Sequence, residues 1–299
     1  MSSKDEIRGT GVPLATPFKA NGKIDEPKLR NLIQWIEQRE IDFFVPCGST
    51  SETELMSHDE RHRVIEIVRD TTNRPILAGT GHPGLKETLR QTTRAADLGI
   101  QAALIVTPFY FQHDQSTLIH YYETVAHQSP IPIYLYQVPI FTNVTLSADT
   151  VEHLAQHDNI TGMKDSAGNM VEFQRFQQRT ESMNFKLFTG SGSLYASSLE
   201  AGAEGGIIAL ANLEPVHSCR IFELIQSEQH DKAHELNRAL LELDQAVTVE
   251  HGIPALKQAM KIRGAPAGYP RKPFRESSES VTQYLSSMLK TLHEEENDC

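Results

Sequence analysis

Short apolar runs typical of buried strands alternate with amphipathic helical stretches along most of this chain. Between the runs, helical periodicity is clear; within residues 25–39, for example, Leu29, Leu32 and Ile33 share one face with Ile36. The predicted strands occupy residues 11–18, 42–47, 75–80, 102–107, 131–138, 160–165, 185–190 and 205–210. Eight β-then-α units in roughly 210 residues predict a (β/α)8 TIM barrel, although element order alone leaves a doubly wound sheet open.

Strand patterns stop after Pro215, and residues 216–296 carry helical patterns only. We therefore predict a barrel catalytic domain over residues 1–222 and a C-terminal helical region over residues 223–299. Closer to the N-terminus, Ser57 begins the sequence SHDE, a capping box that predicts the start of a helix.

Charge and cysteine content narrow the class of protein. The net charge of −11 disfavours a nucleic-acid partner, because phosphate binding needs clustered Lys and Arg. The 3 cysteines are widely spaced without a CxxC pair, which favours a reducing compartment over a disulfide framework or zinc site. The N-terminus has no apolar signal core, and no apolar run reaches the ~18 residues of a membrane span. We expect a cytoplasmic protein.

One lysine stands where the apolar run of residues 160–163 ends. The active site of a barrel forms at the carboxyl ends of its strands, where this chain places hydroxyls, small residues and Lys164. A lysine in a partly dry pocket favours its neutral amine, which attacks carbonyls to form a Schiff base. The alternative is a rim lysine that pairs with Asp165 or another carboxylate.

Several motifs occur in the order and spacing of one family. They are GSTSE at 48–52, VTPFY at 106–110, YQVP at 136–139, GMKDSAGN at 162–169, GIIALAN at 206–212 and the segment 252–274. With these motifs the chain resembles the dihydrodipicolinate synthase / N-acetylneuraminate lyase family of pyruvate-dependent class I aldolases. The late segment particularly resembles the 4-hydroxy-2-oxoglutarate and 2-keto-3-deoxy-sugar-acid aldolase branches.

The resemblance implies a role for each matching residue. Lys164 would be the Schiff-base lysine, and Tyr136 would be the general acid/base at the hydroxyl of the aldol. Ser49 and Thr50 would bind the pyruvyl carboxylate, and Thr50 would connect to Tyr136. No metal or organic cofactor is implied.

The remaining implied roles concern assembly and the pocket wall. Tyr110 matches a tyrosine that reaches into a neighbouring subunit's site, which implies a homotetramer. Gly190 and Ile208 would line the substrate pocket by backbone and apolar contact.

Two positions depart from the family pattern. Ser51 stands where a glycine is usual, and if that glycine needs a positive φ, the serine costs about 1 kcal/mol. Phe141 stands where dihydrodipicolinate synthases carry an arginine for the carboxylate of the aldehyde. We therefore predict an aldolase for 2-keto-3-deoxy sugar acids, with Phe141 at the substrate.

Alternatives remain open at this point. Within the family they are a 4-hydroxy-2-oxoglutarate aldolase, a dihydrodipicolinate synthase-like condensation and a 2-keto-3-deoxy acid dehydratase. A non-catalytic protein that binds a 2-oxo acid belongs to another class. A dinucleotide-dependent oxidoreductase would rest on GTGHPG at 79–84 alone, which a loop after the third strand explains better.

Overall fold

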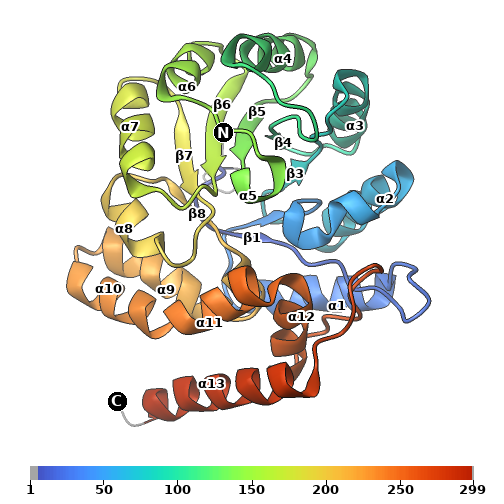
Figure 1. Cartoon of the computed structure of the whole chain (residues 1–299), viewed down its shortest axis with the longest axis vertical. Helices are drawn as coiled ribbons and strands as arrows, with labels where there is room; N and C mark the ends of the chain where they lie inside the picture. Colours follow the sequence, from blue (N-terminus) through green and yellow to red (C-terminus); the bar gives the residue numbers. More distant parts are fainter. Residues whose placement is uncertain (1–5, 298–299) are drawn as a thin grey trace.

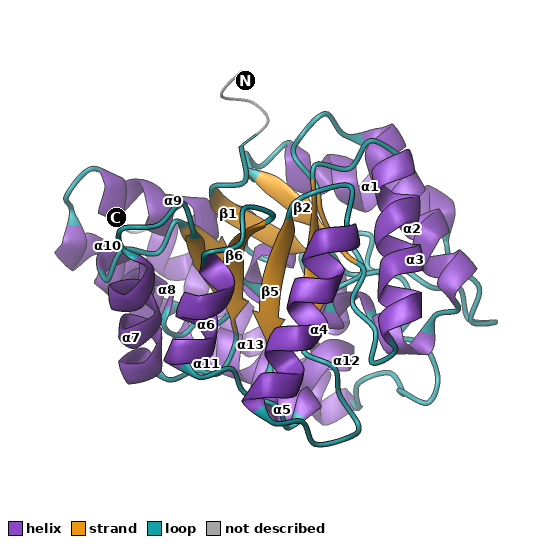
Figure 2. Ribbon diagram, turned by 90° about the horizontal axis from the view of Figure 1, so that it is seen from above, coloured by secondary structure: helices purple, strands orange, loops and turns teal. Residues whose placement is uncertain are grey.

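The computed structural model describes residues 6–297 and shows eight parallel strands enclosed by helices (Figures 1 and 2). The strands are β1 (Gly9–Pro13), β2 (Phe43–Val45), β3 (Leu77–Gly79), β4 (Ala102–Val106), β5 (Ile133–Gln137), β6 (Ile160–Asp165), β7 (Lys186–Thr189) and β8 (Gly205–Ile207). They follow the order β2-β1-β8-β7-β6-β5-β4-β3. A parallel bridge between Phe44 and Ile76 joins the two ends of this sheet, so the predicted (β/α)8 barrel is confirmed.

Helices follow the strands around the barrel and continue beyond it. The α-helices are α1 (Glu26–Glu37), α2 (His58–Thr71), α3 (Leu85–Asp97), α4 (Gln115–Gln128), α5 (Pro139–Thr142), α6 (Ala148–Ala155), α7 (Met170–Thr180), α8 (Tyr195–Glu200), α9 (Pro215–Gln226), α10 (His230–Ala239), α11 (Leu241–Gln245), α12 (Gly252–Ile262) and α13 (Glu279–Asn297). Short 3-10 turns are η1 (Ser49–Ser51), η2 (Thr53–Leu55) and η3 (Ala209–Asn212), and a π-helical turn is η4 (Ala246–Glu250).

The C-terminal part is helical, as predicted. Helices α10 to α13 lie outside the barrel: α10 packs against α8 and α9, α12 lies near α1, and α13 is the outermost (Figure 1). Helix α9 runs across the predicted domain boundary at 222/223, so the division into two domains stays a prediction. No helix in the described part of the chain is both long and apolar enough to span a membrane.

Local sequence signals explain where the helices start. The capping box predicted at Ser57 is present: its hydroxyl accepts from the Glu60 amide, while the Glu60 carboxylate accepts from the Ser57 amide. Asp25 caps α1 by accepting from the Lys28 amide, and the four predicted face residues of α1 are all buried.

The first strand differs from its prediction. It covers Gly9–Pro13, whereas we expected 11–18. After Leu14, the amide of Ala15 bonds to the side chain of Asn212 at 2.9 Å, and Pro17 has no amide to donate. The chain therefore leaves the sheet early, despite its apolar character.

Side chains alternate between two apolar layers. Tyr134, Tyr136 and Phe188 point into the barrel, whereas Leu135 and Leu187 pack beneath the surrounding helices. This period of two is the normal consequence of strand geometry, and it decides which residues reach the barrel mouth.

We predict that Gly205→Ala destabilises the barrel at the β8–β1 contact. An added Cβ would lie 2.7 Å from the carbonyl carbon of Gly9. This atom belongs to the backbone of the neighbouring strand, which can move only at a large cost in free energy. We expect urea denaturation to show a loss of about 2 kcal/mol or more. Gly84→Ala is the control, because there the nearest atom belongs to the His82 imidazole at 3.2 Å. Equal stability of both variants would contradict the close contact.

Candidate active site

Lys164 and Tyr136 lie side by side at the carboxyl ends of neighbouring strands. They are register partners between β5 and β6, and Phe188 on β7 is the next partner of Lys164. The Lys164 ammonium nitrogen lies 4.5 Å from the centre of the Tyr136 ring. Both residues are buried, with 5% and 4% of their surfaces exposed. The strand register thus brings together the two predicted catalytic groups.

Asp165 does not pair with Lys164. Its carboxylate accepts from the Gln137 side chain at 2.7 Å and from the Ala167 amide at 3.0 Å. Burial raises the pKa of Asp165, while the hydrogen bond from Gln137 opposes the shift. Within residues 6–297, Lys164 has no hydrogen bond or ion pair from its amine, so the rim-pair alternative is not what the structure shows.

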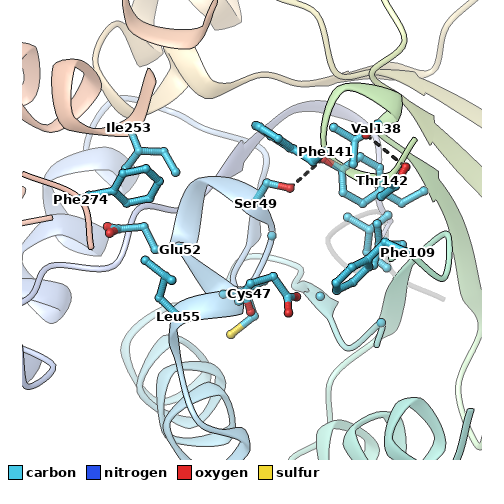
Figure 3. Close-up of a pocket in the computed structure, with 18 residues that line it drawn as sticks. Cys47, Ser49, Glu52, Leu55, Phe109, Val138, Phe141, Thr142, Ile253 and Phe274 are labelled. Atoms are coloured by element: carbon cyan, nitrogen blue, oxygen red, sulfur yellow. Dashed lines mark hydrogen bonds between the residues drawn. The ribbon is translucent and has the colours of Figure 1, made fainter. Parts of the chain in front are cut away.

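The hydroxyl that contacts Tyr136 belongs to Ser49. Its oxygen lies 3.3 Å from the Tyr136 hydroxyl, as the dashed line in Figure 3 marks. We expected Thr50 to make this link, but Thr50 is the following residue of η1 and has no such contact. The hydroxyl contact with Tyr136 therefore falls on Ser49, one position before the residue that we expected.

Ser51 is compatible with the loop. The positive φ angles here belong to Cys47 (60°) and Glu52 (58°), and Ser51 lies in η1 between them. Its buried hydroxyl donates to the Leu14 carbonyl. The condition under which a serine would be strained is therefore not met at this position, because the positive φ falls on the neighbouring Glu52.

A buried ion pair fastens this loop to the C-terminal region. The Glu52 carboxylate lies 2.5 Å from the Lys257 amine, and both side chains are almost completely buried. Lys257 also donates to the carbonyls of Thr16 and Tyr269, and Glu52 accepts from the Arg271 amide. Burial lowers the pKa of Lys257 to about 8, while Glu52 opposes the shift.

The loop after β7 approaches Lys164 closely. A Cβ on Gly190 would lie 2.8 Å from Cε of Lys164 and 2.9 Å from Cβ of Ser166, so only glycine fits without a shift. Ile208, after β8, is buried within the outer apolar layer. Their predicted role in lining the substrate pocket stays a prediction.

Tyr110 points away from the site of its own chain. Its surface is 87% exposed, its φ angle is 80°, and its ring stacks edge-on against Phe111. A tyrosine rarely adopts a positive φ, so the conformation holds the ring outward at some energetic cost. Its contact with a second subunit stays a prediction.

A cavity of about 270 Å³ opens beside the Ser49–Tyr136 pair. Figure 3 shows Phe141 and Val138 on one side, with Ile253 and Phe274 across from them. The complete lining consists of Cys47, Gly48, Ser49, Glu52, Thr53, Glu54, Leu55, Gly79, Gly81, Leu104, Val106, Phe109, Tyr136, Val138, Phe141, Thr142, Ile253 and Phe274. Of the predicted site residues, Ser49, Tyr136 and Phe141 therefore line it.

The sequence did not identify most of the cavity wall. Phe109 adjoins the predicted Tyr110, and Val138 lies within YQVP, so both were within recognised motifs. Ile253 and Phe274 lie at the two ends of the late segment 252–274, and only the folded chain brings them opposite β5.

Comparison with known proteins places the chain in a family. Residues 6–292 match the model of the Dihydrodipicolinate synthetase family, and the chain belongs to it. A 4-hydroxy-tetrahydrodipicolinate synthase from Methanothrix thermoacetophila is 33% identical over 95% of this chain and 96% of that protein. The corresponding protein of Haloarcula marismortui is 32% identical over 97% of this chain and 95% of its own length.

Solved structures agree with this assignment. The dihydrodipicolinate synthase of Acinetobacter baumannii, complexed with pyruvate, superposes with a TM-score of 0.92 at 29% identity, covering 96% of this chain and 99% of the other. A monomeric dihydrodipicolinate synthase variant gives 0.91 at 25% identity, covering 97% and 98%. The chain is therefore a pyruvate-dependent lyase of the lysine Schiff-base type. The relatives' names do not confirm the predicted sugar-acid specificity and favour the synthase alternative.

We predict that Ser51→Gly lowers the stability of the protein. The variant lacks the hydrogen bond to Leu14, and its unfolded chain has more backbone freedom. Together these effects should lower the free energy of unfolding by about 1–2 kcal/mol. Ser51→Ala, which removes the hydroxyl alone, should lose about 1 kcal/mol. Urea denaturation of the three proteins measures both effects, and a more stable glycine variant would argue that serine strains the loop.

We predict that Lys257→Met is strongly destabilising, because it leaves the Glu52 carboxylate buried without its cation. The expected loss is about 3–5 kcal/mol. Combining it with Glu52→Gln should recover part of this loss, since the uncompensated charge disappears. Denaturation of the single and double variants provides the test, and a double variant no more stable than Lys257→Met would exclude charge burial as the cause.

Proposed function

We propose that this protein catalyses reversible aldol chemistry between pyruvate and an aldehyde, with Lys164 as the nucleophile. The observation that carries the proposal is a buried amine next to Tyr136 at the mouth of the barrel, with no carboxylate partner in the part of the chain that the structure describes. Such an amine forms an imine with a 2-oxo acid. The imine withdraws electrons from C3, and this stabilises the enamine through which the C3–C4 bond forms or breaks.

Tyr136 and Ser49 supply the proton chemistry in this proposal. In the addition direction, the enamine carbon attacks the aldehyde carbon, and the aldehyde oxygen takes a proton from the Tyr136 hydroxyl. The proton that C3 loses when the imine becomes the enamine balances the one that Tyr136 gives to the aldehyde, and the Ser49 hydroxyl, 3.3 Å away, relays protons to and from Tyr136. Water then hydrolyses the imine and releases the 4-hydroxy-2-oxo acid and the free amine. Ser49 and Thr50 would hold the carboxylate of pyruvate with their hydroxyls and amides.

The substrates that we propose are 2-keto-3-deoxy acids, with the sugar acids as the first choice from the sequence. Phe141 supports this choice, because it lines the cavity at the place where an arginine would hold a second carboxylate. The same residue disfavours 4-hydroxy-2-oxoglutarate. A dehydratase would remove the C4 hydroxyl through the same imine. Product analysis distinguishes the two reactions, because only the aldolase releases pyruvate.

A second candidate is 4-hydroxy-tetrahydrodipicolinate synthase. It is favoured by the names of curated relatives that are 32–33% identical over nearly the whole chain. The two candidates differ in the aldehyde: the synthase joins pyruvate to aspartate semialdehyde, whereas the sugar-acid aldolase releases an uncharged aldehyde.

Assembly into a homotetramer is part of the proposal. The support is Tyr110, which projects from the surface in an uncommon backbone conformation. A monomeric variant among the structural neighbours shows that this fold does not require assembly. Light scattering of the wild type and of Tyr110→Ala measures the state directly.

We predict that borohydride reduction in the presence of pyruvate leaves a stable adduct on Lys164. Intact mass and peptide mapping would detect it, and the Lys164→Arg variant should show none. Tyr136→Phe is the matched variant: it should retain the adduct while losing at least about a hundredfold in aldol turnover, because only the proton step is removed. A folded wild type that forms no adduct would refute the proposal and favour a non-catalytic protein that binds 2-oxo acids.

A further inference from the structure

The cavity beside Tyr136 is largely apolar. Its apolar side chains come from separate parts of the chain: Leu55 follows β2, Phe109 follows β4, Val138 and Phe141 follow β5, and Ile253 and Phe274 belong to the C-terminal region (Figure 3). With about 270 Å³ of space, it is a concave apolar site of the kind that binds small organic ligands.

The charged residues in this wall are carboxylates. Glu52 is already paired with Lys257, and Glu54 receives a hydrogen bond from Arg61 at 3.0 Å. No Lys, Arg or His is among the described residues that line the cavity. A ligand carboxylate would lose water there without gaining a cation, which is unfavourable.

Three of the four side-chain hydroxyls in the wall have a partner within the described residues, and the fourth, that of Thr53, has none but is buried. The Thr142 hydroxyl lies 3.3 Å from the carbonyls of Val138 and Val144, and Ser49 contacts Tyr136. A chain of substrate hydroxyls would therefore meet few unused partners on this side.

Tyr136 lies at the boundary between the cavity and Lys164. The tyrosine lines the cavity, whereas Lys164 contacts the Tyr136 ring and is not part of the lining. In an aldol of pyruvate, C2 is bonded to the lysine and the C4 oxygen meets the acid/base. The substituent on C4 then extends past Tyr136, and the apolar cavity is the space that lies there.

We infer that the aldehyde partner of this enzyme is uncharged and apolar, with an aromatic or branched aliphatic group held against Phe141, Phe109 and Ile253. The inference rests on the proposed aldol chemistry, and among 2-keto-3-deoxy acids it favours the aldols of apolar aldehydes over the sugar acids that the sequence suggested first. The bonding changes are those of the aldol step given above, and no further reactant is needed.

The test compares four aldehydes with pyruvate and the purified full-length protein. Benzaldehyde is the apolar probe, and glyceraldehyde, glyoxylate and aspartate semialdehyde represent the sugar-acid, oxoglutarate and synthase alternatives. Initial rates of aldol formation, followed by mass spectrometry, give kcat/KM for each. We expect benzaldehyde to exceed each of the others at least tenfold.

Two neighbouring variants locate the effect. Phe141→Arg should lower kcat/KM for benzaldehyde about tenfold and raise it for glyoxylate and aspartate semialdehyde. Ile140→Arg is the matched control, because Ile140 is 73% exposed and does not line the cavity. It should leave the order of preference unchanged.

The outcomes separate this inference from the proposed function. A preference for glyceraldehyde or a charged aldehyde overturns the inference, while a pyruvate adduct on Lys164 would still support aldol chemistry. A Phe141→Arg variant that alters subunit assembly but not aldehyde preference overturns it too, because the cavity would then hold a second copy of the chain. Failure of adduct formation refutes the proposed function itself.

Discussion

The alternation of side chains along β5 and β6 is the constraint on which the rest of the site depends. Because a closed parallel barrel buries both faces of its strands, each second residue must point into the interior. Tyr134 and Tyr136 take those positions on β5, and the register places Lys164 beside Tyr136 on β6. A lysine in this position loses hydration, and an aromatic ring replaces part of it. The same register that closes the barrel therefore holds an amine, unpaired and buried, next to a phenol.

The loop that completes the site is held from a distance. Ser49 reaches Tyr136 from η1, and η1 ends at Glu52, whose carboxylate is bonded to Lys257 on α12. The helices outside the barrel therefore help to fix the geometry at its mouth, so they are more than an addition to the barrel. A buried ion pair is weak evidence for high stability. It does favour one arrangement of the loop and α12, because burying either Glu52 or Lys257 without the other would be costly.

Patterns that act over short range were predictable. The eight strands, the α1 face and the Ser57 cap follow from periodicity and capping within a few residues, and Lys164 was recognisable where an apolar run stops. The end of β1 was not predictable. Just beyond this strand, the Ala15 amide donates to the Asn212 side chain, which lies 197 positions further along the chain. The contact of Ser49 and the relaxed φ of Ser51 depend on how the loop turns at Glu52, which the order of residues does not reveal.

Family membership and substrate choice depend on different parts of this molecule. The lysine, the tyrosine and the strands that carry them belong to the barrel, and the family match covers residues 6–292, which include this barrel. In the proposed function, the aldehyde side would be built from loop and C-terminal residues outside this frame, among them Phe141. A cation opposite Tyr136 would select a carboxylate, whereas we infer that the apolar wall beside Glu54 would disfavour one. The names of the relatives are therefore better evidence for the chemistry at Lys164 than for the identity of the aldehyde substrate.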